Sequence, residues 1–155
     1  MDRMGYGLYW TRIQMKSLKF LYESAKIKSL LPQLAQAAQK CYDDWDESKF
    51  NDPDGFELEY AGGGICHFIA DEFVSILDQH GIEAAAVTQQ VGEQHVFTIA
   101  QLPDGVYIVD IPPSVYETGA AYTWQRKPDI QINVNDIYIE KISNNPEDFE
   151  EYIID

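Results

Sequence analysis

Three residues of this chain have the types and the order of a thiol-based catalytic set. Cys66 follows a run of glycines, His95 lies in a strand-like segment, and Asp110 ends the next such segment. A cysteine is nucleophilic as its thiolate, which a nearby imidazolium and a helix N-terminus both stabilise. The imidazole needs a partner for its second nitrogen, and a carboxylate supplies one. The set therefore predicts a nucleophile, a base and an orienting acid.

The segments around these residues predict a helix followed by antiparallel strands. Apolar residues recur at helical spacing between Ile65 and His80, so a helix is expected to begin at or near Cys66 and to end at Gly81, which is suited to a C-terminal cap. Strand-like runs follow at 83–91, 94–101 and 106–111. A tight turn at Pro103-Asp104-Gly105 would make residues whose numbers sum to about 205 or 208 face each other. His95 and Asp110 then come close to cross-strand pairing on one face.

The remaining segments predict an α+β fold in a single domain, because a chain of 155 residues supports one core. The leading segment 1–46 is expected to be helical from about residue 9 to 45, either broken or bent before Pro32 or restarted by it. The catalytic core is expected over 60–124, and further strands with an acidic tail over 125–155. The finer expectations are loops at 43–55 and 114–124, strands at 130–134 and 137–142, and a short helix or frayed tail at 145–154.

The charge balance excludes a class of partner. The chain has 11 basic and 26 acidic residues, a formal charge of -15, which argues against an electrostatic nucleic-acid binder and leaves a DNA mimic or a binder of basic partners open. Residues 1–40 carry +5 (seven basic, two acidic), so the rest carries -20. This contrast predicts that the leading segment lies against the acidic body or contacts an acidic partner.

Other sequence signals concern location. No apolar run approaches the ~18–20 residues of a membrane span, and the first residues lack the pattern of a signal peptide. The two cysteines are too few for a disulfide framework. The expectation is a cytoplasmic protein, or one exported without a classical signal, with no membrane partner.

The residues around the candidate set resemble a known superfamily. Gly-Gly-Gly-Ile-Cys66-His, Gln-His95-Val-Phe and Gly-Val-Tyr-Ile-Val-Asp110 are similar to the Cys-His-Asp core of papain-like and transglutaminase-like cysteine enzymes. The likeness is closest to small bacterial papain-fold toxin and effector domains, including glutamine deamidases. It implies attack on an amide carbonyl of a protein or peptide substrate through an acyl-enzyme thioester. A cognate inhibitor or immunity protein is a further implied partner.

The resemblance also suggests residues around the nucleophile. Tyr60 stands where papain has a glutamine that donates to the oxyanion, a departure that favours a deamidase or transferase over a peptidase. Gly64, with the other glycines before Cys66, lets a substrate approach and leaves the Cys66 N–H available to an oxyanion. Tyr116 and Trp124 are expected either to wall a substrate groove or to cover the sheet edge.

Plainer explanations remain for each residue. Cys66 alone suits a small buried side chain, His95 a strand histidine, and Asp110 a turn cap. A metal site is not expected, because adjacent ligands on one helical turn fit poorly and no CxxC or HxxxH spacing occurs; no cofactor is expected either. The alternative function is a catalytically silent acidic binding protein, an inhibitor or immunity-type partner that docks on a basic surface.

Overall fold

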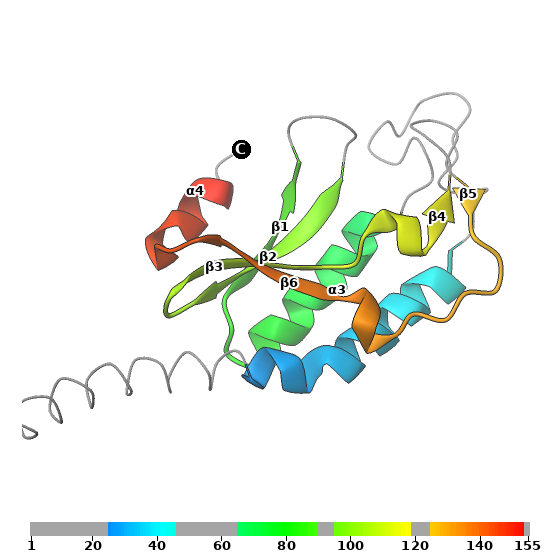
Figure 1. Ribbon diagram of the computed structural model, residues 1–155, viewed down its shortest axis with the longest axis horizontal. Helices are drawn as coiled ribbons and strands as arrows, with labels where there is room; N and C mark the ends of the chain where they lie inside the picture. Colours follow the sequence, from blue (N-terminus) through cyan, green and yellow to red (C-terminus); the bar gives the residue numbers. More distant parts are fainter. Residues whose placement is uncertain (1–24, 46–64, 90–94, 119–124, 154–155) are drawn as a thin grey trace, which may run out of the picture.

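The protein has an α+β fold built on an antiparallel sheet. The computed structural model describes residues 25–45, 65–89, 95–118 and 125–153 (Figure 1). The main sheet has four strands in the order β1-β2-β3-β6, namely Ala84–Thr88, Val96–Leu102, Gly105–Asp110 and Tyr138–Ser143. Residues 25–43 and α3 (Cys66–Gln79) form the longer described helices. The smaller elements are the pair β4 (Glu117–Thr118) and β5 (Gln125–Arg126), helix α4 (Phe149–Ile153), and 3-10 turns at Pro113–Val115, Val134–Asp136 and Pro146–Asp148.

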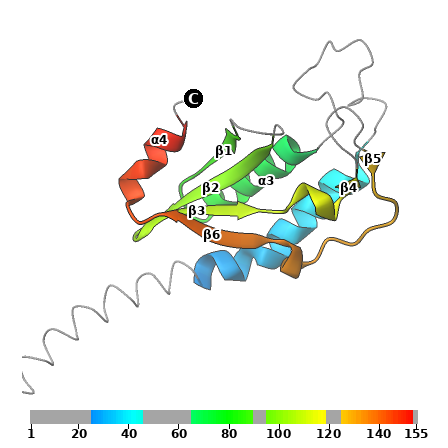
Figure 2. The ribbon, with the colours of Figure 1, turned by 45° about the horizontal axis from the view of Figure 1, so that its top comes forward.

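Two apolar clusters flank the sheet. The larger one joins helix 25–43 and α3 to side chains of β2 and β3, including Leu34, Phe73 and Val109. The smaller one gathers Val87, Ile99 and Val106 around Phe149 of α4. Figures 1 and 2 accordingly show helix 25–43 and α3 together on one side of the sheet and α4 apart from them. The expectation that the basic leading segment lies against the acidic body is thus confirmed for residues 25–43, and residues 1–24 lie outside the described ranges.

Helix α3 forms where the apolar spacing predicted it. It begins at Cys66 and buries Ile69, Ala70, Phe73, Ile76 and Leu77. Gly81 ends it at φ 77°, while the N–H of Ile82 donates to the carbonyl of Leu77 at 2.9 Å. This six-to-one bond and the left-handed glycine define a Schellman cap, which confirms the predicted role of Gly81. The start and the direction of α3 are therefore set by local sequence.

The predicted hairpin forms, but its register is neither of the two expected. β2 and β3 pair with Leu102 opposite Gly105 and Thr98 opposite Val109, so paired numbers sum to 207. Continued by alternation beyond β2, this register places His95 diagonally from Asp110 on one face. The side chains of such diagonal neighbours can meet when one of them is long.

Two expectations about the other segments need correction. No strand forms at 130–134: the chain is extended there and ends in the turn at Val134–Asp136. The side chain of Gln39 accepts from the Ile132 N–H at 2.7 Å, and the Tyr42 hydroxyl accepts from the Ile130 N–H at 3.3 Å. Backbone groups that would join a sheet are thus bound to helix 25–43 instead.

Pro32 also does not break the chain's helix. Residues 25–43 are helical throughout, so of the alternatives expected at Pro32 a break is wrong. The helix bends instead, between the blue and cyan parts of the ribbon (Figures 1 and 2). Proline removes one backbone donor and crowds the preceding turn, which accounts for a bend without a break. The expected strand at 137–142 and the short C-terminal helix are confirmed as β6 and α4. Most of the loop expected at 43–55 lies outside the described residues, as do residues 119–124. The described part of the loop expected at 114–124 instead contains the end of the Pro113–Val115 turn and strand β4, which pairs with β5.

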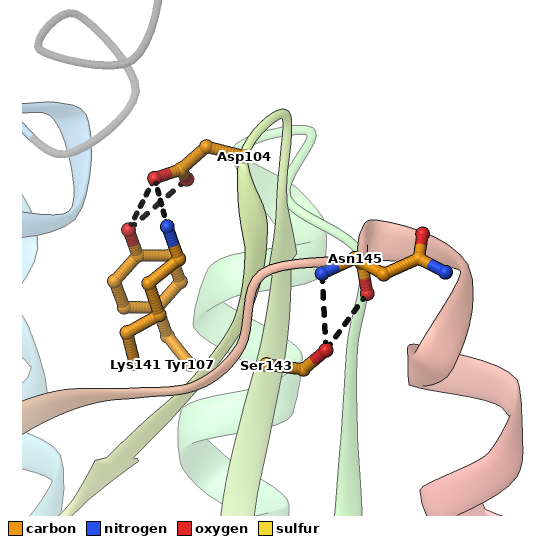
Figure 3. Close-up of polar contacts among 5 residues, drawn as sticks. All are labelled: Asp104, Tyr107, Lys141, Ser143 and Asn145. Carbon is orange, nitrogen blue, oxygen red and sulfur yellow. Dashed lines mark hydrogen bonds and ion pairs between the residues drawn. The ribbon is translucent and has the colours of Figure 1, made fainter.

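The β2–β3 turn is tied to β6 by a polar cluster. Asp104 accepts hydrogen bonds from the Tyr107 hydroxyl at 2.8 and 3.0 Å and pairs with Lys141 at 2.9 Å (Figure 3). At the end of β6, the Ser143 hydroxyl accepts from the Asn145 N–H at 3.0 Å (Figure 3). Beside this cluster, the pairing of β3 with β6 shifts register between Val106 and Tyr107. The ion pair between Lys141 and Asp104 thus links β6 to the β2–β3 turn.

Substitution of Gly105 is expected to disturb this pairing. A Cβ atom at Gly105 would lie 2.0 Å from the backbone oxygen of Ser143, so β6 would have to move. We expect Gly105→Ala to lower the free energy of unfolding by about 1–3 kcal/mol, measured by urea denaturation. Faster amide exchange should be confined to β3 and β6. Unchanged stability and exchange would show that β6 does not hold this position in solution.

Candidate active site

The structure brings His95 and Asp110 into direct contact. His95 immediately precedes β2 and Asp110 ends β3, so both lie at the same end of the antiparallel pair. The His95 Nε2–H donates to Asp110 Oδ2 at 2.7 Å. The side chain of His95 is 15% exposed and that of Asp110 4%, so the pair is shielded from water and weakly screened. Asp110 thereby occupies one ring nitrogen of His95 and sets the orientation of the ring.

Cys66 lies beside this pair at the start of α3. Its side chain is half-buried, and the backbone N–H of Val96, the residue after His95, donates to Cys66 Sγ at 3.5 Å. One turn further along α3, the carbonyl of Ala70 accepts from the buried hydroxyl of Thr98 at 3.2 Å. These two contacts hold α3 to β2 at the position of the sulfur. The first N–H groups of a helix have no acceptor within the helix and place partial positive charge near Cys66.

The surroundings of His95 favour its protonated form. Burial lowers the pKa of His95, but the hydrogen bond to Asp110, the interaction with the Cys66 side chain and their negative charges outweigh it and raise the pKa from 6.5 to about 10. Its Nδ1 is buried and has no hydrogen-bond partner in the described ranges. The ring is thus bound to Asp110 through Nε2, whereas Nδ1 makes no such hydrogen bond in these ranges.

Asp110 has a second side-chain neighbour that sequence reasoning missed. The hydroxyl of Tyr138 donates to Asp110 Oδ2 at 3.4 Å from the start of β6. The Tyr138 and Asp110 backbones pair directly across β6 and β3, so both side chains leave the same face. Burial raises the pKa of Asp110, and the hydrogen bonds from His95 and Tyr138 act against that rise. Tyr138 could be recognised only from the pairing of β6 with β3. The alternation of residues within β6 does not show which strand β6 pairs with.

Tyr116 lies close to the same group of residues. Its ring is fully buried and packs edge-on against Trp45, with 6.3 Å between centroids. Burial, followed by the negative charge of Cys66, raises the pKa of Tyr116 well above its usual value. Its hydroxyl has no partner in the described ranges. Tyr116 is therefore a buried side chain packed against Trp45, whereas Tyr60, Gly64 and Trp124 lie outside the residues that the structure describes.

A pocket adjoins the first turn of α3. Its volume is about 760 Å³, and it lies between helix 25–43 and α3, with Ile65, Phe68 and Cys41 among its lining residues. The acidic side chains of Asp71 and Glu72 also line it. Burial raises the pKa of Cys41 to about 11, so this second thiol stays protonated at neutral pH. No group of three or more metal-ligating side chains is found within the described ranges.

Comparison of the chain with models of protein families, with curated proteins and with solved structures finds no match. Within the described part, no helix has the length and apolar character that a membrane crossing requires.

The raised pKa of His95 predicts a pH-dependent stability. The folded pKa of about 10 exceeds the unfolded value of 6.5, so the stabilisation from the protonated ring is complete below pH 6.5 and is lost as pH rises toward 10. We expect the stability difference between the wild type and His95→Gln to shrink over this window, measured by urea unfolding at each pH. A constant difference across the window would contradict a protonated His95 at neutral pH.

Proposed function

We propose that this chain is a cysteine-dependent amidohydrolase or acyltransferase that acts on a peptide or side-chain amide, as its resemblance to papain-like and transglutaminase-like enzymes implies. The observation that carries the proposal is the 2.7 Å contact between His95 Nε2 and Asp110, formed beside a half-buried Cys66 at a helix start. A structural cysteine sealed in the core would not face such a pair. The arrangement matches a nucleophile, a base and an orienting group.

The reaction follows from these positions. The Cys66 sulfur, deprotonated by His95, attacks the amide carbonyl carbon and forms a C–S bond. The tetrahedral intermediate collapses, the C–N bond breaks, and the leaving amine takes the proton from His95. Water or an acceptor amine then attacks the thioester carbonyl and gives its proton to His95. The second tetrahedral intermediate collapses, the C–S bond breaks, and Cys66 leaves as a thiolate beside protonated His95. Asp110 keeps the ring oriented and stabilises its cationic form throughout.

The oxyanion of each tetrahedral intermediate needs hydrogen-bond donors. The Cys66 backbone N–H opens α3, where helical amides have no internal acceptor, and it is the first proposed donor. Tyr60 is proposed as a second donor on the basis of the resemblance alone. Tyr116 is fully buried against Trp45, which favours the expectation that it covers the sheet edge over contact with a substrate.

Charge indicates the kind of substrate. The proposed core lies in the part of the chain that carries -20, and Asp71 and Glu72 line the pocket beside the first turn of α3. A cationic or neutral protein segment meets less repulsion there than an acidic one. The proposal includes a protein or peptide substrate and, as for toxin and effector domains, a cognate inhibitor or immunity protein. Two free cysteines suit a reducing compartment such as the cytoplasm, or a protein exported without a classical signal.

An acyl-transfer probe tests the proposal. With p-nitrophenyl acetate, the wild type should show a burst of p-nitrophenol and an acetyl group on Cys66 by peptide mass spectrometry. Cys66→Ala should abolish the burst, and Cys41→Ala, the matched control on the second thiol, should retain it. Acetylation of both thiols at equal rates, without a burst, would contradict the proposal that this chain is a cysteine-dependent enzyme. That result would favour the catalytically silent acidic binding protein, whose affinity for a basic partner should fall with added salt.

A further inference from the structure

Tyr138 contacts the proposed acid from a strand outside the Cys-His-Asp sequence pattern. It opens β6 and pairs with Asp110 of β3, which directs both side chains to one face. The Tyr138 hydroxyl lies 3.4 Å from Oδ2 of Asp110, the same oxygen that accepts from His95 at 2.7 Å. One carboxylate oxygen therefore receives two donors that come from different strands.

This second donor matters because Asp110 is almost fully buried. The residue is 3% exposed, so few water molecules can solvate its charge, and a buried carboxylate requires donors to remain ionised. Its donors are His95, Tyr138 and the backbone of Ile111. Burial and the charge of Asp110 raise the pKa of Tyr138 to about 12, so its hydroxyl is a proton donor across the neutral range.

We propose that Tyr138 is a positioning residue that holds the Asp110 carboxylate toward His95 and helps to keep it ionised. The expected effect of Tyr138 on catalysis rests on the proposed function. Its effect on the orientation and the pKa of Asp110 does not. Tyr138 touches neither Cys66 nor the reacting atoms; it acts through Asp110. Tyr138 is 38% exposed and is not part of either core cluster, so loss of the hydroxyl alone leaves the packing of the core intact.

The kinetic test compares two tyrosine variants. Tyr138→Phe should lower kcat for p-nitrophenyl acetate by about 2- to 10-fold, the range for one hydrogen bond, with KM unchanged. The acid limb of its pH profile should move to higher pH, because Asp110 protonates more readily without this donor. Tyr152→Phe is the matched control: Tyr152 is also 38% exposed, and its hydroxyl donates to the Ile142 carbonyl at 3.4 Å. This control should leave both quantities as in the wild type.

A second measurement separates this inference from the proposed function. An NMR titration of the Asp110 carboxyl carbon should show that its pKa rises in Tyr138→Phe and not in Tyr152→Phe. If the wild type has no acyl-transfer activity but the pKa of Asp110 still rises in Tyr138→Phe, the proposed function fails. The role of Tyr138 in positioning Asp110 is then still supported. If the Asp110 titration and the pH profile are the same in the wild type and Tyr138→Phe, Tyr138 does not position the acid.

Discussion

Replacement of His95 by alanine is expected to slow the reaction of Cys66 with limiting iodoacetamide at pH 7 by about 10- to 30-fold. An ordinary cysteine is only a few per cent thiolate at this pH, whereas an imidazolium beside the sulfur stabilises the anion. His95 supplies that cation, since its pKa is raised to about 10. Turnover of an acyl substrate should fall further, by about 10²- to 10⁴-fold, because the variant also lacks its proton carrier. Peptide mass spectrometry after timed quenching measures the labelling rate.

Cys41 is the internal control for this experiment. Burial raises its pKa to about 11, so it should react slowly in both the wild type and His95→Ala. In the wild type, Cys66 should therefore be labelled much faster than Cys41, and the variant should lose most of that difference. Equal labelling of both thiols in the wild type would remove the basis of the proposed mechanism.

Replacement of Phe73 by alanine is expected to lower the free energy of unfolding by about 3–5 kcal/mol, the usual range for removal of a buried phenylalanine. Phe73 is 0% exposed and lies in the larger core cluster, in the middle of α3. It anchors the helix whose first residue is Cys66, so the loss should also reduce the reactivity of Cys66 in the folded variant. Urea denaturation followed by circular dichroism gives the stability change.

Phe68 provides the matched control on the same helix. It is 38% exposed and lines the pocket between helix 25–43 and α3 instead of the core. We expect Phe68→Ala to cost about 1–2 kcal/mol, less than Phe73→Ala, because more than a third of Phe68 stays in contact with water and the residue is not part of the core cluster. Similar losses for Phe68→Ala and Phe73→Ala would mean that the packing of α3 on the sheet differs in solution.

The sequence predicted those parts of the site that depend on near neighbours. The start of α3 at Cys66 follows from apolar spacing after a glycine run, and its end from a single glycine that adopts φ 77°. The turn at Pro103-Asp104-Gly105 sets the register of β2 and β3 within a few residues. The approach of His95 to Asp110 could therefore be predicted from the chain alone.

Tertiary structure decided what depends on distant partners. Tyr138 reaches Asp110 because β6 pairs with β3 after a connection of more than twenty residues, a choice that local alternation does not contain. Segment 130–134 alternates like a strand, yet Gln39 and Tyr42 bind its backbone to helix 25–43. Alternation of apolar and polar residues shows that a segment can form a strand. Which partner it binds depends on the backbone donors and acceptors that the folded chain brings within reach. For that reason the contact between His95 and Asp110 could be predicted from the sequence, whereas the contact between Tyr138 and Asp110 could not.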